Sequence, residues 1–285
     1  MTESPTAYSV ETLAEAYAVL AEQGSRVRVI AGGTDLMVLM NAQQLAAASF
    51  LDIWRVGELR GISDEGDNLR IGALTTYTEL IRSPLVQEVA PSLVAASRTI
   101  GAIQIQNRGT LGGNIVNGSP AGDSLPVLAA YDAELEIGSI RGGRRVAFNR
   151  FYTGYRQTVL AADELLVAVR LPKLTAGERD FFFKVGTRRA QAISKVVMAA
   201  RIQASGRLIK AIRIAIGSVA PTVIRAPRTE ALLAGQTISP DLIKRAQATI
   251  AGEVLPITDL RSTERYRRTV TGTVLAKCLR RLGSD

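Results

Sequence analysis

Two pairs of adjacent glycines, each followed by small polar residues, are the part of this sequence best suited to bind a ligand. The first lies in Ala31-Gly32-Gly33-Thr34-Asp35 and the second in Gly109-Thr110-Leu111-Gly112-Gly113-Asn114. Glycine has no Cβ, so its backbone can come close to a ligand and point N–H groups at phosphate oxygens. Two such segments in one chain predict a long diphosphate ligand held at two points, which is the shape of a dinucleotide.

The residues around each pair bear on whether it binds a ligand at all. Neither segment has the spacing of a nicotinamide-binding loop, and no lysine follows either pair as in a P-loop. A single glycine pair after a strand is more often an ordinary tight turn. Here each pair is followed by threonine, asparagine or aspartate, whose side chains can bond a ribose or a phosphate. Two such pairs favour a ligand site without deciding it.

The composition excludes several kinds of chemistry. The chain has 285 residues, no histidine and one cysteine, Cys278. Without histidine, Ser-His-Asp and Cys-His catalysis, histidine-bearing zinc sites and a flavin attached to histidine are excluded. One cysteine cannot form an internal disulfide or hold an iron–sulfur cluster. Any chemistry must therefore come from a bound cofactor or from carboxylates, lysines and tyrosines.

Hydrophobicity and charge describe an ordinary globular protein. Hydrophobic residues make up 47% of the chain and charged residues 21%, as in folded domains. No apolar run is long enough to span a membrane and residues 1–5 lack the basic start of a signal peptide, so we expect a cytoplasmic protein. The net charge of +9 is largely dispersed, without interleaved aromatic residues, which argues against nucleic-acid binding.

Hydrophobic periodicity indicates the elements that position the two glycine pairs. Helical spacing over 10–22 predicts a first helix, with Ser9 as its N-cap. A strand over 26–30 runs into the first pair, and a short helix over 36–48 and a strand over 50–53 follow. A hairpin is expected at 59–62 and 69–71, then helices at 78–82 and 85–99, with a break near Gly101. The second pair comes next, and a helix over 124–131 packs behind it.

The remaining pattern suggests a second domain. Strands are expected at 133–140, 144–148 and 164–171, and the polar stretch 174–180 is interpreted as a linker. Beyond it, strands are expected at 181–185 and 208–219, and helices at 228–233, 240–251 and 263–282. The pattern of residues 192–204 fits either a helix or a strand. The expected domains are 1–174, with parts 1–56 and 57–174, and 175–285.

The order of residues around the two pairs resembles one known family. Residues 29–36, Val-Ile-Ala-Gly-Gly-Thr-Asp-Leu, are similar to the first flavin loop of the FAD-binding medium subunits of molybdenum hydroxylases, the xanthine dehydrogenase and carbon monoxide dehydrogenase relatives. Residues 100–115 with 119–126 resemble their second loop. The similarity continues at Phe183-Lys184-Val185-Gly186 and at 259–268, so it covers almost the whole chain in order.

The resemblance implies a fold and a set of cofactor contacts. The fold would be α+β, with a vanillyl-alcohol-oxidase-type (PCMH-type) FAD-binding domain of two α/β subdomains and a C-terminal α/β domain like that of the CO dehydrogenase flavoprotein. The first loop would bind the FAD diphosphate through its amides, and Lys184 would stabilise negative charge on the reduced flavin or its phosphates. No catalytic side chain and no metal ligand are expected. The residues implied at the cofactor are Val29, Ile30, Ala31, Gly32, Gly33, Thr34, Asp35, Leu36, Ile100, Gly101, Thr110, Gly113, Asn114, Val116, Asn117, Gly122, Asp123, Leu171 and Lys184.

Some of these residues have simpler alternative roles. Asp123, implied near the adenosine ribose, could instead cap the helix expected at 124–131. Lys184 could be a solvated charge on the edge of a strand. Tyr152 and Tyr155 are interpreted as packing residues, with screening of the flavin as the alternative.

The resemblance also implies partners. A large subunit would hold molybdopterin and hydroxylate the substrate, and a small subunit with two [2Fe–2S] clusters would pass electrons to FAD in this chain. The assembly would be a dimer of heterotrimers, and the final acceptor would be NAD, a quinone, oxygen or another carrier. The alternatives are a stand-alone flavin oxidase of the same fold superfamily and a basic scaffold or nucleic-acid-binding protein without a cofactor.

Overall fold

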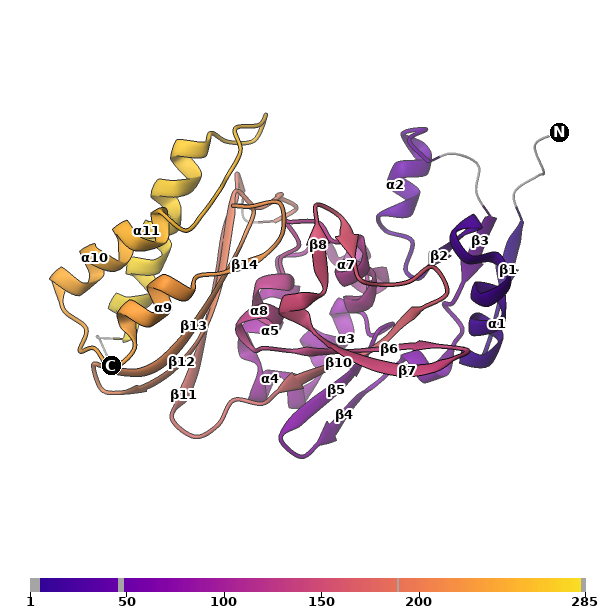
Figure 1. The fold of residues 1–285 in the computed structure, drawn as a ribbon, viewed down its shortest axis with the longest axis horizontal. Coiled ribbons are helices and arrows are strands. Elements are labelled where there is room, and N and C mark those ends of the chain that lie inside the picture. Colours follow the sequence, from indigo (N-terminus) through magenta and orange to yellow (C-terminus); the bar gives the residue numbers. More distant parts are fainter. Residues whose placement is uncertain (1–5, 46–48, 189, 283–285) are drawn as a thin grey trace.

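The computed structural model describes residues 6–45, 49–188 and 190–282, whose elements follow one another along the long axis of the molecule (Figure 1). The N-terminal unit is a parallel sheet in the order β1-β3-β2 with helix α1 beside it. Because the strands are parallel, their carboxyl ends share one edge, and the first glycine pair leaves from that edge. The elements are β1 (Ala7–Ser9), α1 (Leu13–Gln23), β2 (Val27–Ile30), α2 (Leu36–Asn41) and β3 (Ser49–Asp52).

The start of this unit differs from the expectation. The first helix begins at Leu13, and its N-cap is Thr12, which forms a capping box with Glu15. Ser9 ends β1 and pairs in parallel with Asp52. That pairing joins residues more than 40 positions apart, so local periodicity could not predict it. The expected helix over 36–48 ends at Asn41, and residues 46–48 lie outside the described residues.

The middle unit is an antiparallel sheet in the order β4-β5-β10-β6-β7, and helices α3, α4, α5, α7 and α8 contribute with it to the largest apolar core. The chain enters this sheet, leaves it to form the helices, and returns to complete it. A small hairpin, β8–β9, lies beside α7 (Figure 1). The bounds are β4 (Ile62–Glu65), β5 (Asn68–Gly72), α3 (Tyr77–Arg82), α4 (Pro84–Val89), α5 (Pro91–Ser97), α6 (Ile103–Arg108), α7 (Leu111–Asn117), α8 (Leu125–Ala130), β6 (Glu134–Ser139), β7 (Gly142–Ala147), β8 (Tyr152–Gly154), β9 (Gln157–Thr158) and β10 (Leu165–Pro172).

Three expectations for the middle unit are corrected. The single helix over 85–99 is two helices, because Pro91 has no N–H to continue α4 and instead begins α5. Leu59 is the buried residue of a 3-10 turn, and the strand begins only at Ile62. The segment around the second glycine pair is helical, as α6 and α7, and not a loop.

The C-terminal unit is an antiparallel sheet, β11-β12-β13-β14, covered on one face by α9, α10 and α11. Its other face contacts α5 and α8 of the middle unit, so the sheet stands between two helical layers. Residues 192–204, which fitted either interpretation, contribute to β12, where Met198 and Ala199 are buried on opposite faces. The bounds are β11 (Glu178–Val185), β12 (Val196–Ser205), β13 (Leu208–Gly217), β14 (Ile224–Arg225), α9 (Pro227–Leu233), α10 (Pro240–Ala251) and α11 (Glu264–Leu282).

Candidate cofactor-binding site

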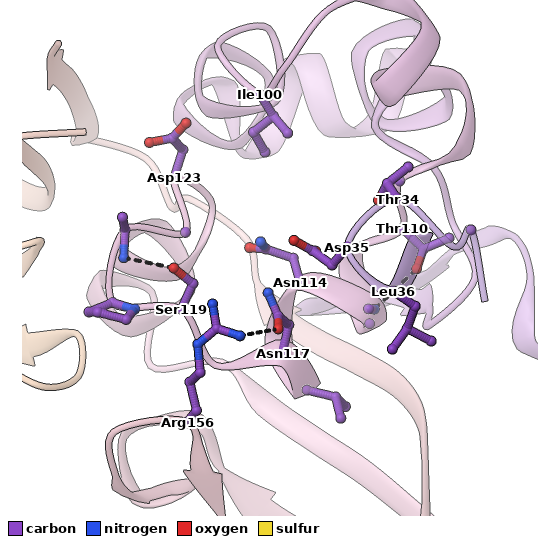
Figure 2. A pocket seen from close by; sticks show the side chains of 18 of the residues that line it. Thr34, Asp35, Leu36, Ile100, Thr110, Asn114, Asn117, Ser119, Asp123 and Arg156 are labelled. Atoms are coloured by element: carbon purple, nitrogen blue, oxygen red, sulfur yellow. Dashed lines mark hydrogen bonds between the residues drawn. The ribbon is translucent and has the colours of Figure 1, made fainter. Parts of the chain in front are cut away.

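A cavity of about 1310 Å³ lies where the three units meet. Its walls come from the first glycine loop, from α7 and the segments before and after it, from the start of β10, and from residues of the C-terminal unit. Figure 2 shows side chains from Thr34, Asp35, Asn114, Asn117 and Asp123 gathered around this space. Segments far apart in sequence therefore form one site.

The first glycine loop offers main-chain N–H groups to the cavity. Gly33 has a φ of 74°, which glycine adopts readily, and its carbonyl accepts from the N–H of Met37 at the start of α2. Within the described residues, no hydrogen bond uses the N–H groups of residues 32–35. Backbone N–H groups in a folded protein are normally paired. A group of unpaired ones lining a cavity is suited to an anionic ligand such as a diphosphate.

The second glycine pair behaves differently. Its two N–H groups are already bonded, because Gly112 donates to the carbonyl of Ala73 at 2.9 Å and Gly113 to Thr110 Oγ1 at 3.1 Å. The N–H of Leu111, just before the pair, donates to the carbonyl of Thr75 at 3.0 Å. A Cβ on Gly112 would lie 2.7 Å from the Ala73 carbonyl oxygen, so this glycine is needed for packing. The expectation that both pairs offer free N–H groups is therefore wrong for the second pair.

Helix α7 contributes side chains to the cavity instead of amides. Asn114, Val116 and Asn117 line it, and Asn114 Oδ1 accepts a hydrogen bond from Ser124 Oγ at 2.9 Å. Asn117 Oδ1 accepts one from Arg156 Nη1 at 3.1 Å, as Figure 2 shows. Amide side chains of this kind can bond either phosphate or hydroxyl oxygens.

Arg156 is a cavity residue that the sequence did not reveal. It lies in the turn between β8 and β9 and brings a cation to the wall that also carries Asp35. Burial raises the pKa of the Asp35 carboxyl, and the charge of Arg156 opposes that rise. The hairpin is far from both glycine pairs in sequence, so only its packing against α7 places Arg156 here.

Asp123 and Lys184 form a buried ion pair between the middle and C-terminal units. Lys184 Nζ donates to Asp123 Oδ2 at 2.5 Å and to the Thr99 carbonyl at 3.1 Å, and Ser194 Oγ donates to Asp123 Oδ1 at 2.5 Å. The two charged side chains are 9% and 6% exposed. Burial raises the pKa of the Asp123 carboxyl, and the nearby Lys184 ammonium opposes it. The alternative roles do not hold, because Lys184 is not solvated and Asp123 bonds Lys184 rather than capping α8.

Most of the predicted residues line this one cavity. They are Val29, Ala31, Gly32, Gly33, Thr34, Asp35, Leu36, Ile100, Gly101, Thr110, Gly113, Asn114, Val116, Asn117, Gly122, Asp123 and Lys184. The structure brings these residues together, and their contact with the cofactor stays a prediction.

Two predicted residues lie outside the cavity lining. Ile30 packs beneath Gly33, with its side chain 3.6 Å from where a Cβ on Gly33 would lie. Leu171 pairs with Leu69 and is 1% exposed in the core of the middle sheet. The β10 side chains that do line the cavity are Leu165 and Leu166, at the other end of the strand.

The C-terminal unit supplies further lining residues that sequence reasoning missed. Ile193 is 54% exposed beside the buried Ser194. The remaining lining residues of this unit include Ser218, Leu255, Ile257, Asp259, Arg261 and Arg267. Tyr155 also lines the cavity, whereas Tyr152 is largely buried and donates its hydroxyl hydrogen to the Ile115 carbonyl at 2.8 Å. No sequence motif marks these positions, because antiparallel pairing and sheet packing bring them to the site.

The wall chemistry suits a flavin dinucleotide. An anionic diphosphate fits the unpaired amides of the first loop, and apolar side chains such as Leu165, Leu166 and Ile193 suit flat aromatic rings. Among the described residues, no group of three or more histidine, cysteine, aspartate or glutamate residues is placed to hold a metal ion. No described helix is long and apolar enough to cross a membrane.

Comparison with known families agrees with this site. The family described as the FAD-binding domain in molybdopterin dehydrogenase matches residues 3–174, and that described as the CO dehydrogenase flavoprotein C-terminal domain matches residues 181–282. The chain belongs to the FAD-binding medium subunits of molybdenum hydroxylases. This medium subunit is thus an oxidoreductase component, and the expected fold class is confirmed.

Individual relatives match over nearly the full length. The medium subunit is 34% identical to the xanthine dehydrogenase FAD-binding subunit of Escherichia coli O157:H7, over 94% of this chain and 92% of that one. It is 32% identical to the carbon monoxide dehydrogenase medium chain of Hydrogenophaga pseudoflava, over 95% and 94%. Among solved structures, carbon monoxide dehydrogenase from the same organism superposes with a TM-score of 0.93 at 31% identity, covering 97% of this chain and 96% of that one.

Proposed function

We propose that this medium subunit carries electrons through FAD between a small partner subunit with two [2Fe–2S] clusters and an external acceptor. A large partner subunit with molybdopterin would carry out the hydroxylation. The observation that best supports FAD as the ligand is the set of unpaired N–H groups of residues 32–35 in a cavity built by all three units. When bound, the flavin supplies the redox chemistry, because it exchanges electrons with other cofactors and with diffusible acceptors.

The chain's own residues would bind and orient the cofactor rather than move protons. The first loop would hold the diphosphate, with Arg156 adding positive charge on the same wall. Lys184 would provide a fixed buried cation whose charge Asp123 largely balances. Leu165, Leu166 and Ile193 would keep water from the ring system. In this proposal, residues 1–174 form the flavin domain and 175–285 the C-terminal domain.

The test is reconstitution. The chain purified alone should bind FAD yet oxidise no organic substrate, and adding the molybdenum and iron–sulfur subunits should give substrate-dependent flavin reduction in stopped-flow absorbance. Assays with NAD, a quinone and oxygen would then identify the acceptor, and light scattering would test for a dimer of heterotrimers. Substrate turnover by the chain alone would instead support a stand-alone flavin oxidase, and absence of flavin binding would contradict the proposal.

A further inference from the structure

Arg108, the last residue of α6, lies at the junction between the two glycine segments. One segment follows β2 in the N-terminal parallel sheet, and the other begins at Gly109 in the middle unit. Strands β2 and β3 are adjacent and end in register, Ile30 opposite Asp52. The loops after these strands therefore leave the sheet side by side, and Arg108 contacts both of them.

The backbone of Arg108 abuts the first glycine loop. A Cβ placed on Gly32 would lie 1.8 Å from the Arg108 carbonyl oxygen and 3.3 Å from the Gly109 nitrogen. No side chain fits between these two peptides, so the contact sets the closest approach of the two glycine segments.

The side chain of Arg108 contacts the loop after β3. Its guanidinium carbon lies 3.8 Å from the centroid of the Trp54 ring, and the guanidinium carbon of Arg60 lies 4.5 Å from the same centroid. Both distances are typical of cation–π contacts. Trp54 is itself fixed, because its N–H donates to Asp52 Oδ1 at 2.9 Å and its carbonyl accepts from Arg60 Nη2 at 2.6 Å.

The residues after Arg108 connect it directly to α7, so the position of Arg108 affects the position of that helix. The Gly109 carbonyl accepts from the N–H of Tyr77 at 3.2 Å, and Thr110 is the N-cap of α7. Asn114 and Asn117 of that helix line the same cavity as the first glycine loop, and Figure 2 shows Asn114 beside Asp35. A shift of Arg108 would therefore change the distance between the amides of the first loop and these two side chains.

We propose that Arg108 is a positioning residue for FAD. Contact with Gly32 limits how closely the Arg108 backbone approaches the first glycine loop. The cation–π contact of the Arg108 side chain with Trp54, which Arg60 also contacts, prevents Arg108 from moving away from that loop. The distance between the amides of the first loop and the side chains of Asn114 and Asn117, where the diphosphate would bind, is thereby fixed. Arg108 is exposed and is not among the cavity-lining residues, so it acts on the cofactor only through the segments it joins. This inference rests on the assignment of the cavity to FAD.

The test compares Arg108→Ala and Arg108→Lys with a matched control, Lys277→Ala. Lys277 is also exposed and lies 3.8 Å from the centroid of the Phe183 ring, outside the cavity lining. FAD would be titrated into the full-length apoprotein of each variant, with the thermal midpoint of each apoprotein measured in parallel. We expect Arg108→Ala to weaken FAD binding roughly three- to tenfold, as loss of a contact of this kind would. Arg108→Lys should recover part of the loss, and Lys277→Ala should bind as wild type.

Trp54 gives a readout that a general loss of stability would not change in the same way. It is the chain's only tryptophan, so its fluorescence reports this stack alone. In apoprotein that remains folded, Arg108→Ala should shift the emission to longer wavelength, and Lys277→Ala should not. Equal FAD affinity in Arg108→Ala and Lys277→Ala, or no recovery in Arg108→Lys, would overturn the positioning role while leaving FAD binding intact. Wild-type apoprotein that binds no FAD would overturn the cofactor assignment as well.

Discussion

Gly32 shows how one missing Cβ shapes the cofactor site. The residue serves two purposes, because it presents an unpaired N–H to the cavity and lies directly against the Arg108 carbonyl. Any larger residue has to displace the backbone of one of the two glycine segments. Glycine is therefore required at position 32 because there is no space for a Cβ.

Gly32→Ala should accordingly weaken FAD binding and lower the free energy of unfolding by about 1–3 kcal/mol, the usual cost of overpacking. Gly57→Ala is the control, because a Cβ there meets no atom within 4 Å. Urea unfolding and FAD titration of both variants measure the effect. Wild-type behaviour of Gly32→Ala in both measurements would show that the loop is not held against Arg108.

Lys184 illustrates the cost of leaving one buried charge without its partner. Lys184→Met should destabilise the protein by about 3–5 kcal/mol, because Asp123 then stays buried without its cation. The double variant Lys184→Met with Asp123→Asn should regain much of this loss. Lys173→Met is the control, since its partner Asp64 has a side chain that is 49% exposed, and surface pairs contribute about 0–1 kcal/mol. Urea unfolding of wild type and the three variants measures these free energies. Equal losses of unfolding free energy in Lys184→Met and Lys173→Met would count against a structural role for the buried pair.

At the scale of elements, one ion pair holds the connection between the middle and C-terminal sheets. Arg201 on β12 donates from Nε and Nη2, one edge of its guanidinium, to the two carboxylate oxygens of Glu178 on β11. Its Nη1 and Nη2 also donate to the carbonyls of Pro172 and Lys173, respectively. The stretch 174–180, interpreted from sequence as a linker, is therefore tied to the sheet, and β11 begins within it. The composition of this stretch showed that it is polar, but could not show that Glu178 forms an ion pair with Arg201, 23 positions later.

The same pair predicts an acid-dependent loss of stability. Burial alone would raise the pKa of Glu178, but hydrogen bonds from Arg201 and Thr175 lower it from 4.5 to about 2. A carboxyl with a lowered folded-state pKa stabilises the protein above its unfolded pKa, and this contribution is lost as pH falls toward 2. Wild type should therefore exceed Glu178→Gln in unfolding free energy by about 2 kcal/mol at neutral pH, and the difference should shrink between about pH 5 and pH 3. Urea unfolding across this range measures it, and a pH-independent difference would contradict the assigned pair.

At the scale of the whole molecule, the cavity couples three separate cores. Each unit has its own buried apolar cluster, and the cavity walls draw residues from all three. A ligand in the cavity should therefore stabilise the units together, because it binds the folded arrangement and not the unfolded chain.

FAD at about 100 times its Kd should raise the thermal midpoint by roughly 5–10 °C in a single transition. Riboflavin, which has the ring system without the diphosphate, should raise it much less at the same concentration, because it cannot use the amides of residues 32–35. Differential scanning calorimetry measures both shifts. A riboflavin shift equal to that of FAD would show that the first loop does not bind the diphosphate.

The sequence by itself determined what depends on local chemistry. Helix α10, expected over 240–251 and found at Pro240–Ala251, and strongly alternating strands such as β13 follow from neighbours in the chain. The first glycine loop also belongs here, because its missing Cβ atoms and small polar residues are visible in the sequence. The order of motifs was sufficient to identify the family.

The tertiary structure alone decided which of these groups are free to act. The second glycine pair resembled the first in sequence, yet its two N–H groups already donate to the Ala73 carbonyl, on another segment, and to Thr110 Oγ1. In sequence, Lys184 could have been a solvated charge on a strand edge, but in the structure it is buried in an ion pair with Asp123. Leu171 was expected at the cofactor, but strand pairing places it in the core. Burial and pairing between distant segments set these outcomes, because a donor or charge is available to a ligand only if no nearer partner takes it.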